Sequence, residues 1–217
     1  LALTVSDPRW LYLAGLTVAA SCFAVKIPLI RRSGNQSLSI TVSDVFIFAG
    51  LFFFGFAPAV VLAVIEGLVG SYRVRVKRLY KRLFNASQLA LAAFVTGQLF
   101  LVLHPAPLSV RTAPDVAGLL PKAAVCAVIY FLLNSAMVCA AISMVTKQTF
   151  GDLWKRNILW FSAANIVNEA TAAVIFVYFT PTNFSPLLAG IPLVLVLYYA
   201  RRVNLARARD AHEPTTQ

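Results

Sequence analysis

Histidine, cysteine and acidic residues are scarce in this sequence. Its 217 residues include two histidines, three cysteines and eight aspartate or glutamate residues, against 19 lysine or arginine residues. The three cysteines fall inside apolar segments and show no CxxC spacing. A reduced cysteine in such a segment behaves as a small hydrophobic residue. We therefore expect no disulfide, no metal site and no cofactor.

The same scarcity argues against an enzyme. The two histidines, His104 and His212, lie beside a proline-rich loop and in the C-terminal tail. The sequence contains no HExxH, GxSxG or P-loop motif. A nucleophile with an orienting base cannot be assembled from such residues, so we expect this chain to catalyse no reaction.

Apolar residues, by contrast, are abundant. Hydrophobic residues make up 59% of the chain and charged residues 12%, and the mean hydropathy is +0.78. Soluble domains have about 45–50% apolar and about 25% charged residues, so apolar side chains here must face lipid as well as a core. We predict an all-α polytopic membrane bundle of six to seven transmembrane segments, each of about 20 residues. It forms a single domain over residues 1–205, followed by a short polar cytoplasmic tail over 206–217.

Apolar runs and their polar boundaries predict where the helices lie. A first span is expected to start at Ser6-Asp7-Pro8 and to run to about Ile30, followed by a polar loop over Arg31–Ser39. Thr41 and Asp44 then have the spacing of a capping box. Later spans are expected over about 82–103, 122–145, 153–179 and 186–204.

The stretch from Thr41 to Tyr72 determines the topology. As one helix it would measure about 40 Å, too long for a hydrocarbon core of about 30 Å. Gly55 and Pro58 also interrupt it. The alternative is a short or re-entrant arm over about 43–54 and a returning helix over about 58–72. A short arm is tolerated at membrane depth only where protein covers its backbone.

The basic residues favour the doubled-back alternative. With seven segments, most of the 19 lysine and arginine residues fall on one side, and the positive-inside rule makes that side cytoplasmic. The N-terminus is then outside and the C-terminus in the cytoplasm. The densest group on that side is the basic loop, with Arg73, Arg75, Lys77, Arg78, Lys81 and Arg82.

Several polar residues lie inside the predicted spans. Ionisable side chains at bilayer depth cost at least about 2.5–3.5 kcal/mol on insertion scales, so each needs a reason. The candidate intramembrane polar pocket comprises Glu66, Asn85, Gln88, Asn134, Asn165, Asn168 and Glu169. Two interpretations stay open. The residues line a pocket for a small ligand or a cation, or they form interhelical hydrogen bonds worth about 0.6 kcal/mol each.

The net charge of +11 raises the question of nucleic acid. The cations, however, lie between apolar runs and form no patch with interleaved aromatic residues, so we expect no nucleic-acid binding. Attraction to membrane lipids with anionic headgroups is the simpler interpretation.

Six segments carry a family resemblance that covers roughly residues 10–202. They are VKIPLI, SLSITVSDVFIFAGLFFFGFAPAVVLAVIEGLVGS, RLFNASQLALAAFVTGQLF, FLLNSAMVCAAISMVTKQ, GDLWKRNILW and YYARR. Together with the basic loop, they resemble the multi-span N-terminal membrane region of bacterial HD-GYP and diguanylate cyclase signalling proteins. The resemblance implies a sensory or anchoring module of the bacterial inner membrane, whose last helix leads into a cytoplasmic effector that handles cyclic di-GMP. Glu66 stands where such proteins are expected to carry aspartate. These residues contain no HD, GYP or GGDEF motif, so the resemblance assigns them no cyclic-nucleotide chemistry.

Two functional hypotheses follow. The first is a non-enzymatic sensory or anchoring module that signals through its last helix, Pro186–Arg209, to a cytoplasmic effector or partner protein. The second is a small integral component that binds a transported substrate and resembles the substrate-binding subunits of vitamin-uptake transporters. Neither hypothesis names the small ligand, and the sequence leaves the oligomeric state open, a homo-oligomer included.

Overall fold

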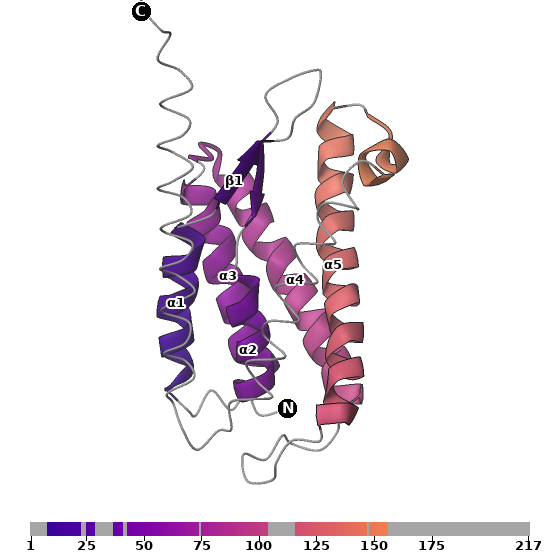
Figure 1. Cartoon of the computed structure of the whole chain (residues 1–217). Coiled ribbons are helices and arrows are strands. Elements are labelled where there is room, and N and C mark those ends of the chain that lie inside the picture. The colour runs from indigo at the N-terminus through magenta and orange to yellow at the C-terminus, as the bar shows by residue number, and fades with distance from the viewer. Residues whose placement is uncertain are drawn as a thin grey trace, which may run out of the picture.

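Upright helices packed side by side form the body of the molecule. The computed structural model describes residues 8–22, 25–28, 37–40, 43–73, 75–103, 116–146 and 148–155. Their elements are α1 (Trp10–Cys22), β1 (Val25–Pro28), β2 (Ser37–Ile40), α2 (Asp44–Phe54), α3 (Phe56–Arg73), α4 (Leu79–Leu103) and α5 (Val116–Thr146). Successive helices run in alternating directions (Figure 1), which is the arrangement of a helical membrane bundle.

Among the described residues, three helical segments are long and apolar enough to cross a membrane. They cover residues 56–73, 79–103 and 121–145. The apolar helices α1 and α2 are shorter, with 13 and 11 residues. The prediction of a helical membrane fold is confirmed. The described residues contain three segments that could span a membrane, whereas six to seven were predicted for the whole chain. The expected spans over 153–179 and 186–204 and the tail over 206–217 lie beyond the described residues, apart from a helical segment at 150–155.

The segment after α1 departs from the prediction. The first helix was expected to reach about Ile30 and to be followed by a loop, but it ends at Cys22 and a short antiparallel pair, β1 with β2, follows. Val25 and Ile27 are β-branched and favour extended backbone, and Pro28 cannot continue a helix. The all-α description therefore needs one addition, a two-stranded hairpin at one end of the bundle (Figure 1).

The stretch that determines the topology doubles back. α2 ends at Phe54, Gly55 adopts a φ of +92° that favours glycine, and α3 begins at Phe56. A side chain added at Gly50 would come within 2.6 Å of Leu62 Cδ1. The two helices therefore lie antiparallel against each other, which confirms the alternative of a short arm and a returning helix.

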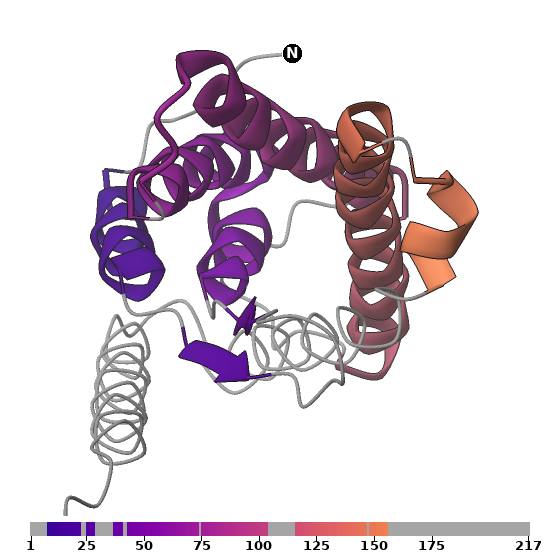
Figure 2. The same ribbon diagram turned by 90° about the horizontal axis from the view of Figure 1, so that it is seen from above.

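The short helix α2 lies at the centre of the bundle. Every residue from Asp44 to Phe52 is buried, and Figure 2 shows α1, α3, α4 and α5 around this helix. Phe48 meets Tyr130 of α5 edge-on with ring centroids 5.3 Å apart, and Phe52 meets Phe100 of α4 at the same distance. Protein thus covers the backbone of the short arm, which is the condition for placing it at membrane depth.

A small-residue contact sets the closest approach of α3 and α4. A Cβ at Gly67 would lie 2.6 Å from Ala86 Cα and 2.8 Å from its backbone nitrogen. No larger side chain fits between backbones at that distance, so glycine lets the two helices touch. The contact also fixes their antiparallel register, with Gly67 level with Ala86.

Candidate functional site

The helical hairpin places one carboxylate in the middle of the bundle. Glu66 on α3 is 7% exposed, and Ser43, immediately before α2, is fully buried. The Ser43 hydroxyl donates a hydrogen bond of 2.5 Å to Glu66 Oε1. Although Ser43 holds the N-cap position of α2, it makes no side-chain capping bond there. Thr41, which was expected to form the capping box, lies outside the described residues.

A second buried carboxylate, Asp44, lies in the first turn of α2. The hydroxyl of the fully buried Tyr130 donates a long hydrogen bond of 3.4 Å to Asp44 Oδ1. The N-terminal end of a helix favours a negative charge at this position. Sequence reasoning treated Asp44 only as a capping residue and left Ser43 and Tyr130 out of the pocket. An acidic residue at the start of a wholly apolar run was the available signal.

Two amide side chains lie at the same level on α4 and α5. The Cys126 sulfur lies 4.0 Å from the Thr96 carbonyl oxygen, which sets the register of these antiparallel helices. Gln88 lies eight residues before Thr96 on α4, and Asn134 lies eight residues after Cys126 on α5. Because the two helices are antiparallel, Gln88 lies level with Asn134. Among the described residues, the side-chain oxygens of Gln88 and Asn134 are buried and have no hydrogen-bond partner. A buried acceptor in that state costs about 1–3 kcal/mol.

Asn85 makes an interhelical contact instead. Its Nδ2 donates a 2.9 Å hydrogen bond to Ser71 Oγ, which joins α4 to α3. This matches the hydrogen-bonding interpretation of the polar residues, and the energy of such bonds in membrane proteins is modest. Of the other predicted pocket residues, Asn165, Asn168 and Glu169 lie outside the described residues.

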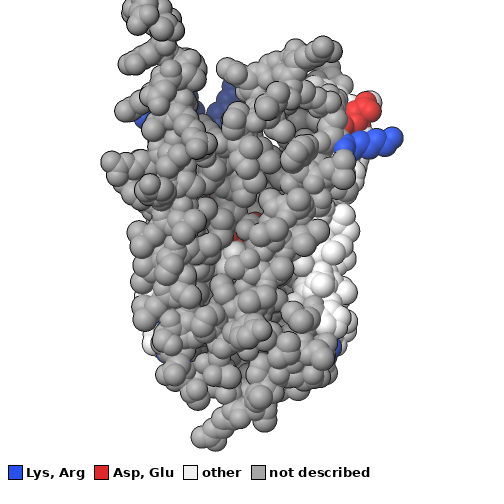
Figure 3. Space-filling view, viewed as in Figure 1, with Lys and Arg blue, Asp and Glu red and all other residues white. Residues whose placement is uncertain are grey.

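Glu66, Gln88 and Asn134 thus come to one level of the bundle, because Gly67 is level with Ala86 and Gln88 is level with Asn134. We call the group of Ser43, Asp44, Glu66, Gln88, Tyr130 and Asn134 the polar layer. Figure 3 shows acidic atoms at mid-height of the molecule, well separated from the charged side chains at its upper right edge. The layer offers carboxylate, amide and hydroxyl oxygens, which suit a hard cation or the polar group of a small molecule. The described residues hold no group of three or more histidine, cysteine or acidic residues spaced for a metal.

The predicted basic loop becomes a tightly closed turn over residues 74–78, with Arg73 at the end of α3 and Lys81 and Arg82 in the first turn of α4. Arg75 has a φ of +56°. Its N–H donates to the Tyr72 carbonyl at 2.9 Å, and the Val76 N–H donates to the Ser71 carbonyl at 3.0 Å. This pair of bonds is a Schellman closure of α3. Arg82 then donates from Nε to the Val76 carbonyl at 2.6 Å, and its guanidinium lies 5.8 Å from the Tyr72 ring centroid.

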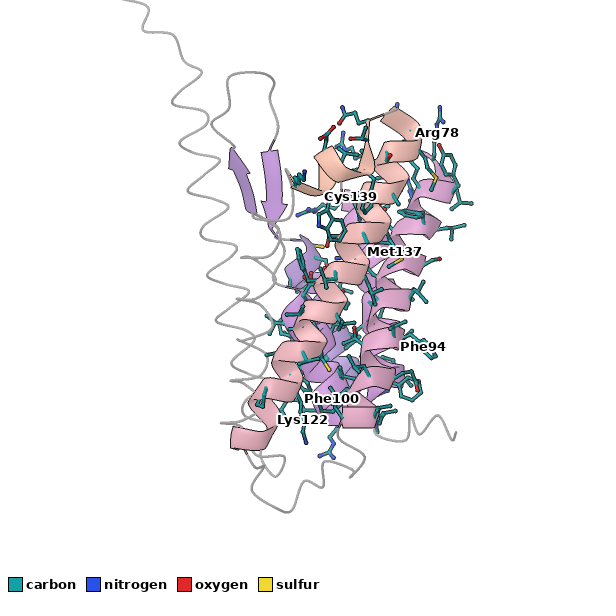
Figure 4. The ribbon with its side chains drawn as sticks, turned by 90° about the vertical axis from the view of Figure 1, so that its right-hand side faces the viewer. Arg78, Phe94, Phe100, Lys122, Met137 and Cys139 are labelled. Atoms are coloured by element: carbon teal, nitrogen blue, oxygen red, sulfur yellow. The ribbon has the colours of Figure 1, made fainter. Side chains whose placement is uncertain are left out.

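The remaining cations of the loop lie at the surface. Arg75, Lys77, Arg78 and Lys81 are exposed. Arg78 donates to the Tyr80 hydroxyl at 3.1 Å, and this hydrogen bond raises the pKa of Arg78. Figure 4 shows Arg78 at one end of the bundle and Lys122 at the opposite end. The sequence Arg73–Arg82 contains no acidic residue, so its positive charge is not compensated within the loop.

The fold and the polar layer define a helical domain that has three described segments apolar enough to cross a membrane and carboxylates in its interior. The family model MASE9 matches residues 12–205. The chain belongs to the MASE9 family, a family of membrane-associated sensor domains. Neither a curated protein nor a solved structure matches it. The family confirms the membrane sensory part of the resemblance drawn from the sequence.

Proposed function

We propose that this chain is a non-enzymatic sensory module of the bacterial inner membrane, coupled to cyclic di-GMP-type signalling in the cytoplasm. The match to MASE9 over residues 12–205 carries the proposal. The resemblance of the same region to the membrane part of HD-GYP and diguanylate cyclase proteins supplies the type of signalling. Catalysis would belong to an effector domain or a partner protein that receives the signal.

The polar layer is the proposed input site. Its hydrogen bonds join α2 to two different helices, Ser43 to Glu66 on α3 and Tyr130 on α5 to Asp44. A ligand or cation that binds one arrangement of these groups more tightly shifts the population toward that arrangement. Movement of α2 would then pass to the tightly packed α3 and α4, and the effector would receive it through the last helix that the sequence predicts, over residues 186–209.

The charge distribution supports the orientation of six to seven spans with the N-terminus outside and the C-terminus in the cytoplasm. The basic loop follows the end of α3 and Lys155 follows the end of α5, and both of these helix ends lie at the same end of the bundle. Arg9 precedes α1 at the opposite end of the bundle (Figure 1). Thiol labelling of intact cells tests this orientation in a cysteine-free chain. Arg9→Cys should react with an impermeant reagent, and Lys77→Cys should react only after permeabilisation. The reverse pattern would contradict the orientation.

Coupling to cyclic di-GMP is tested first by reading the coding sequence on both sides of these residues. A frame that continues into a cyclase or phosphodiesterase domain supports the proposal. In that protein, Glu66→Gln should change the cyclic di-GMP content of the cells, whereas Ser87→Ala, on the exposed face of α4, should not. A Glu66→Gln variant that folds normally and leaves cyclic di-GMP unchanged would contradict an input role for the layer.

A substrate-binding or transport role is the second proposal. The buried amide oxygens of Gln88 and Asn134 favour it, because a bound substrate would supply the hydrogen bonds that they lack among the described residues. Here the purified chain should bind its substrate without a partner, and Glu66→Gln or Glu169→Gln should abolish binding. If both variants bind as the parent protein does, the acids are structural.

A further inference from the structure

The basic loop has a defined shape. Five residues, 74–78, separate α3 from α4, and the Schellman closure fixes the turn at its start. Arg82 holds the other side of the turn through its bond to the Val76 carbonyl. The outward-pointing cations are therefore presented from a fixed backbone, which lowers the conformational entropy that a ligand must remove on binding.

The cations of the loop fall into two groups. Arg82 lies over the Tyr72 ring and Arg78 bonds to Tyr80, so both are engaged within the protein. The side chains of Arg75, Lys77 and Lys81 are exposed, and no hydrogen bond or ion pair to a described residue holds them. Arg75 also occupies a left-handed position where glycine would be less strained. These three cations are available to an external anion.

Large apolar and aromatic side chains surround the same cations. Tyr72 is 75% exposed, Leu79 67%, Tyr80 59% and Leu83 53%. Such a cluster is unfavourable in water, whereas tyrosine, leucine and cations together are typical of the membrane interface, where apolar parts enter the acyl region and cations meet phosphates. The neighbourhood therefore favours a lipid over an acidic soluble protein.

We propose that Arg75, Lys77 and Lys81 form a docking surface for the phosphates of anionic lipid headgroups. Each cation near an anionic surface contributes about 1 kcal/mol, roughly a fivefold change in affinity. The surface is distinct from the polar layer, and it fixes the height of α3 and α4 relative to the headgroups.

The test uses the full chain in dodecyl maltoside micelles, titrated with phosphatidylglycerol, with bound lipid counted by native mass spectrometry. The triple variant Arg75→Gln, Lys77→Gln, Lys81→Gln should weaken phosphatidylglycerol binding at least about tenfold. The control removes three charges outside the loop, Arg9→Gln, Lys122→Gln and Lys155→Gln, and should weaken binding by no more than about fivefold, because of the three only Lys155 lies at the end of the bundle that carries the loop. The variant Lys77→Arg, Lys81→Arg keeps the charge and should also bind normally, which separates lost charge from misfolding.

Several outcomes would overturn the proposal. The first is that the parent protein retains phosphatidylcholine and phosphatidylglycerol equally. The second is that the two triple variants weaken phosphatidylglycerol binding equally. The third is that inorganic phosphate competes for the surface as strongly as the lipid does. Binding of an acidic peptide to the loop in preference to phosphatidylglycerol would assign the surface to a protein partner instead.

Discussion

Ser43 donates a hydrogen bond of 2.5 Å to Glu66, although 23 residues separate them in the sequence. On one straight helix these residues would lie about 35 Å apart. The bond forms because the chain reverses at Gly55 and lays α2 antiparallel on α3. This contact places a carboxylate in the interior and joins the central helix to its neighbour.

Removing the donor should destabilise the protein. Ser43→Ala leaves the Glu66 carboxylate buried without this hydrogen bond, and a loss of that kind costs about 1–3 kcal/mol. Reversible unfolding in detergent measures the change. Ser87→Ala, at an exposed position of α4, is the control and should stay within about 0.5 kcal/mol of the parent protein. Equal effects of the two substitutions would contradict the contact.

Two glycines of α3 should respond in opposite directions. Gly67→Ala places a methyl group against the Ala86 backbone and should cost about 1–3 kcal/mol by overpacking. Gly70→Ala meets no described atom within 4 Å and should stabilise the helix by about 0.5–1 kcal/mol. Thermal unfolding of the two variants, compared in the same detergent, provides the test. Stabilisation by both would mean that α3 and α4 do not touch at Gly67.

Tyr130 should stabilise the protein mainly through the packing of its ring. Its hydrogen bond to Asp44 is long, at 3.4 Å, whereas the ring packs edge-on against Phe48. Tyr130→Phe should therefore cost less than about 1 kcal/mol, and Tyr130→Ala about 3–5 kcal/mol. Chemical denaturation distinguishes the two. A large loss in Tyr130→Phe would show that the hydroxyl is the stronger contribution.

Arg75 should be replaceable by glycine with a gain in stability. Its φ of +56° costs an ordinary residue about 1–2 kcal/mol, and glycine avoids this cost. Arg75→Gly should raise the unfolding free energy by about 1 kcal/mol, whereas Lys77→Gly, which also removes one charge, should not. If both variants lose stability, the left-handed conformation at Arg75 is wrong.

The sequence was sufficient to predict the reversal within 41–72. The length of the stretch, the break at Gly55 and the positive-inside rule each favoured a short arm, and α2 ends at the predicted Phe54. The two-stranded hairpin of β1 and β2 was not predicted, because an apolar run such as Val25–Pro28 has the same composition as the end of a membrane helix. Only its pairing with β2 distinguishes the two.

The sequence analysis identified some residues of the polar layer and missed others. Glu66, Gln88 and Asn134 stand out as polar residues in apolar helices. Ser43 and Tyr130 do not, because serine and tyrosine are common near helix ends and interfaces. Their roles depend on contacts across 23 and 86 residues, which no local pattern encodes.

The most direct test of the central claim, that α2 folds back on α3 and bonds to its carboxylate, is a double-mutant cycle between Ser43→Ala and Glu66→Gln. The unfolding free energies of the parent, the two single variants and the double variant are measured in one detergent. Direct contact predicts a coupling energy of at least about 1 kcal/mol. Additivity within about 0.5 kcal/mol would mean that the two side chains do not meet, and the doubled-back arrangement with its buried carboxylate would be wrong.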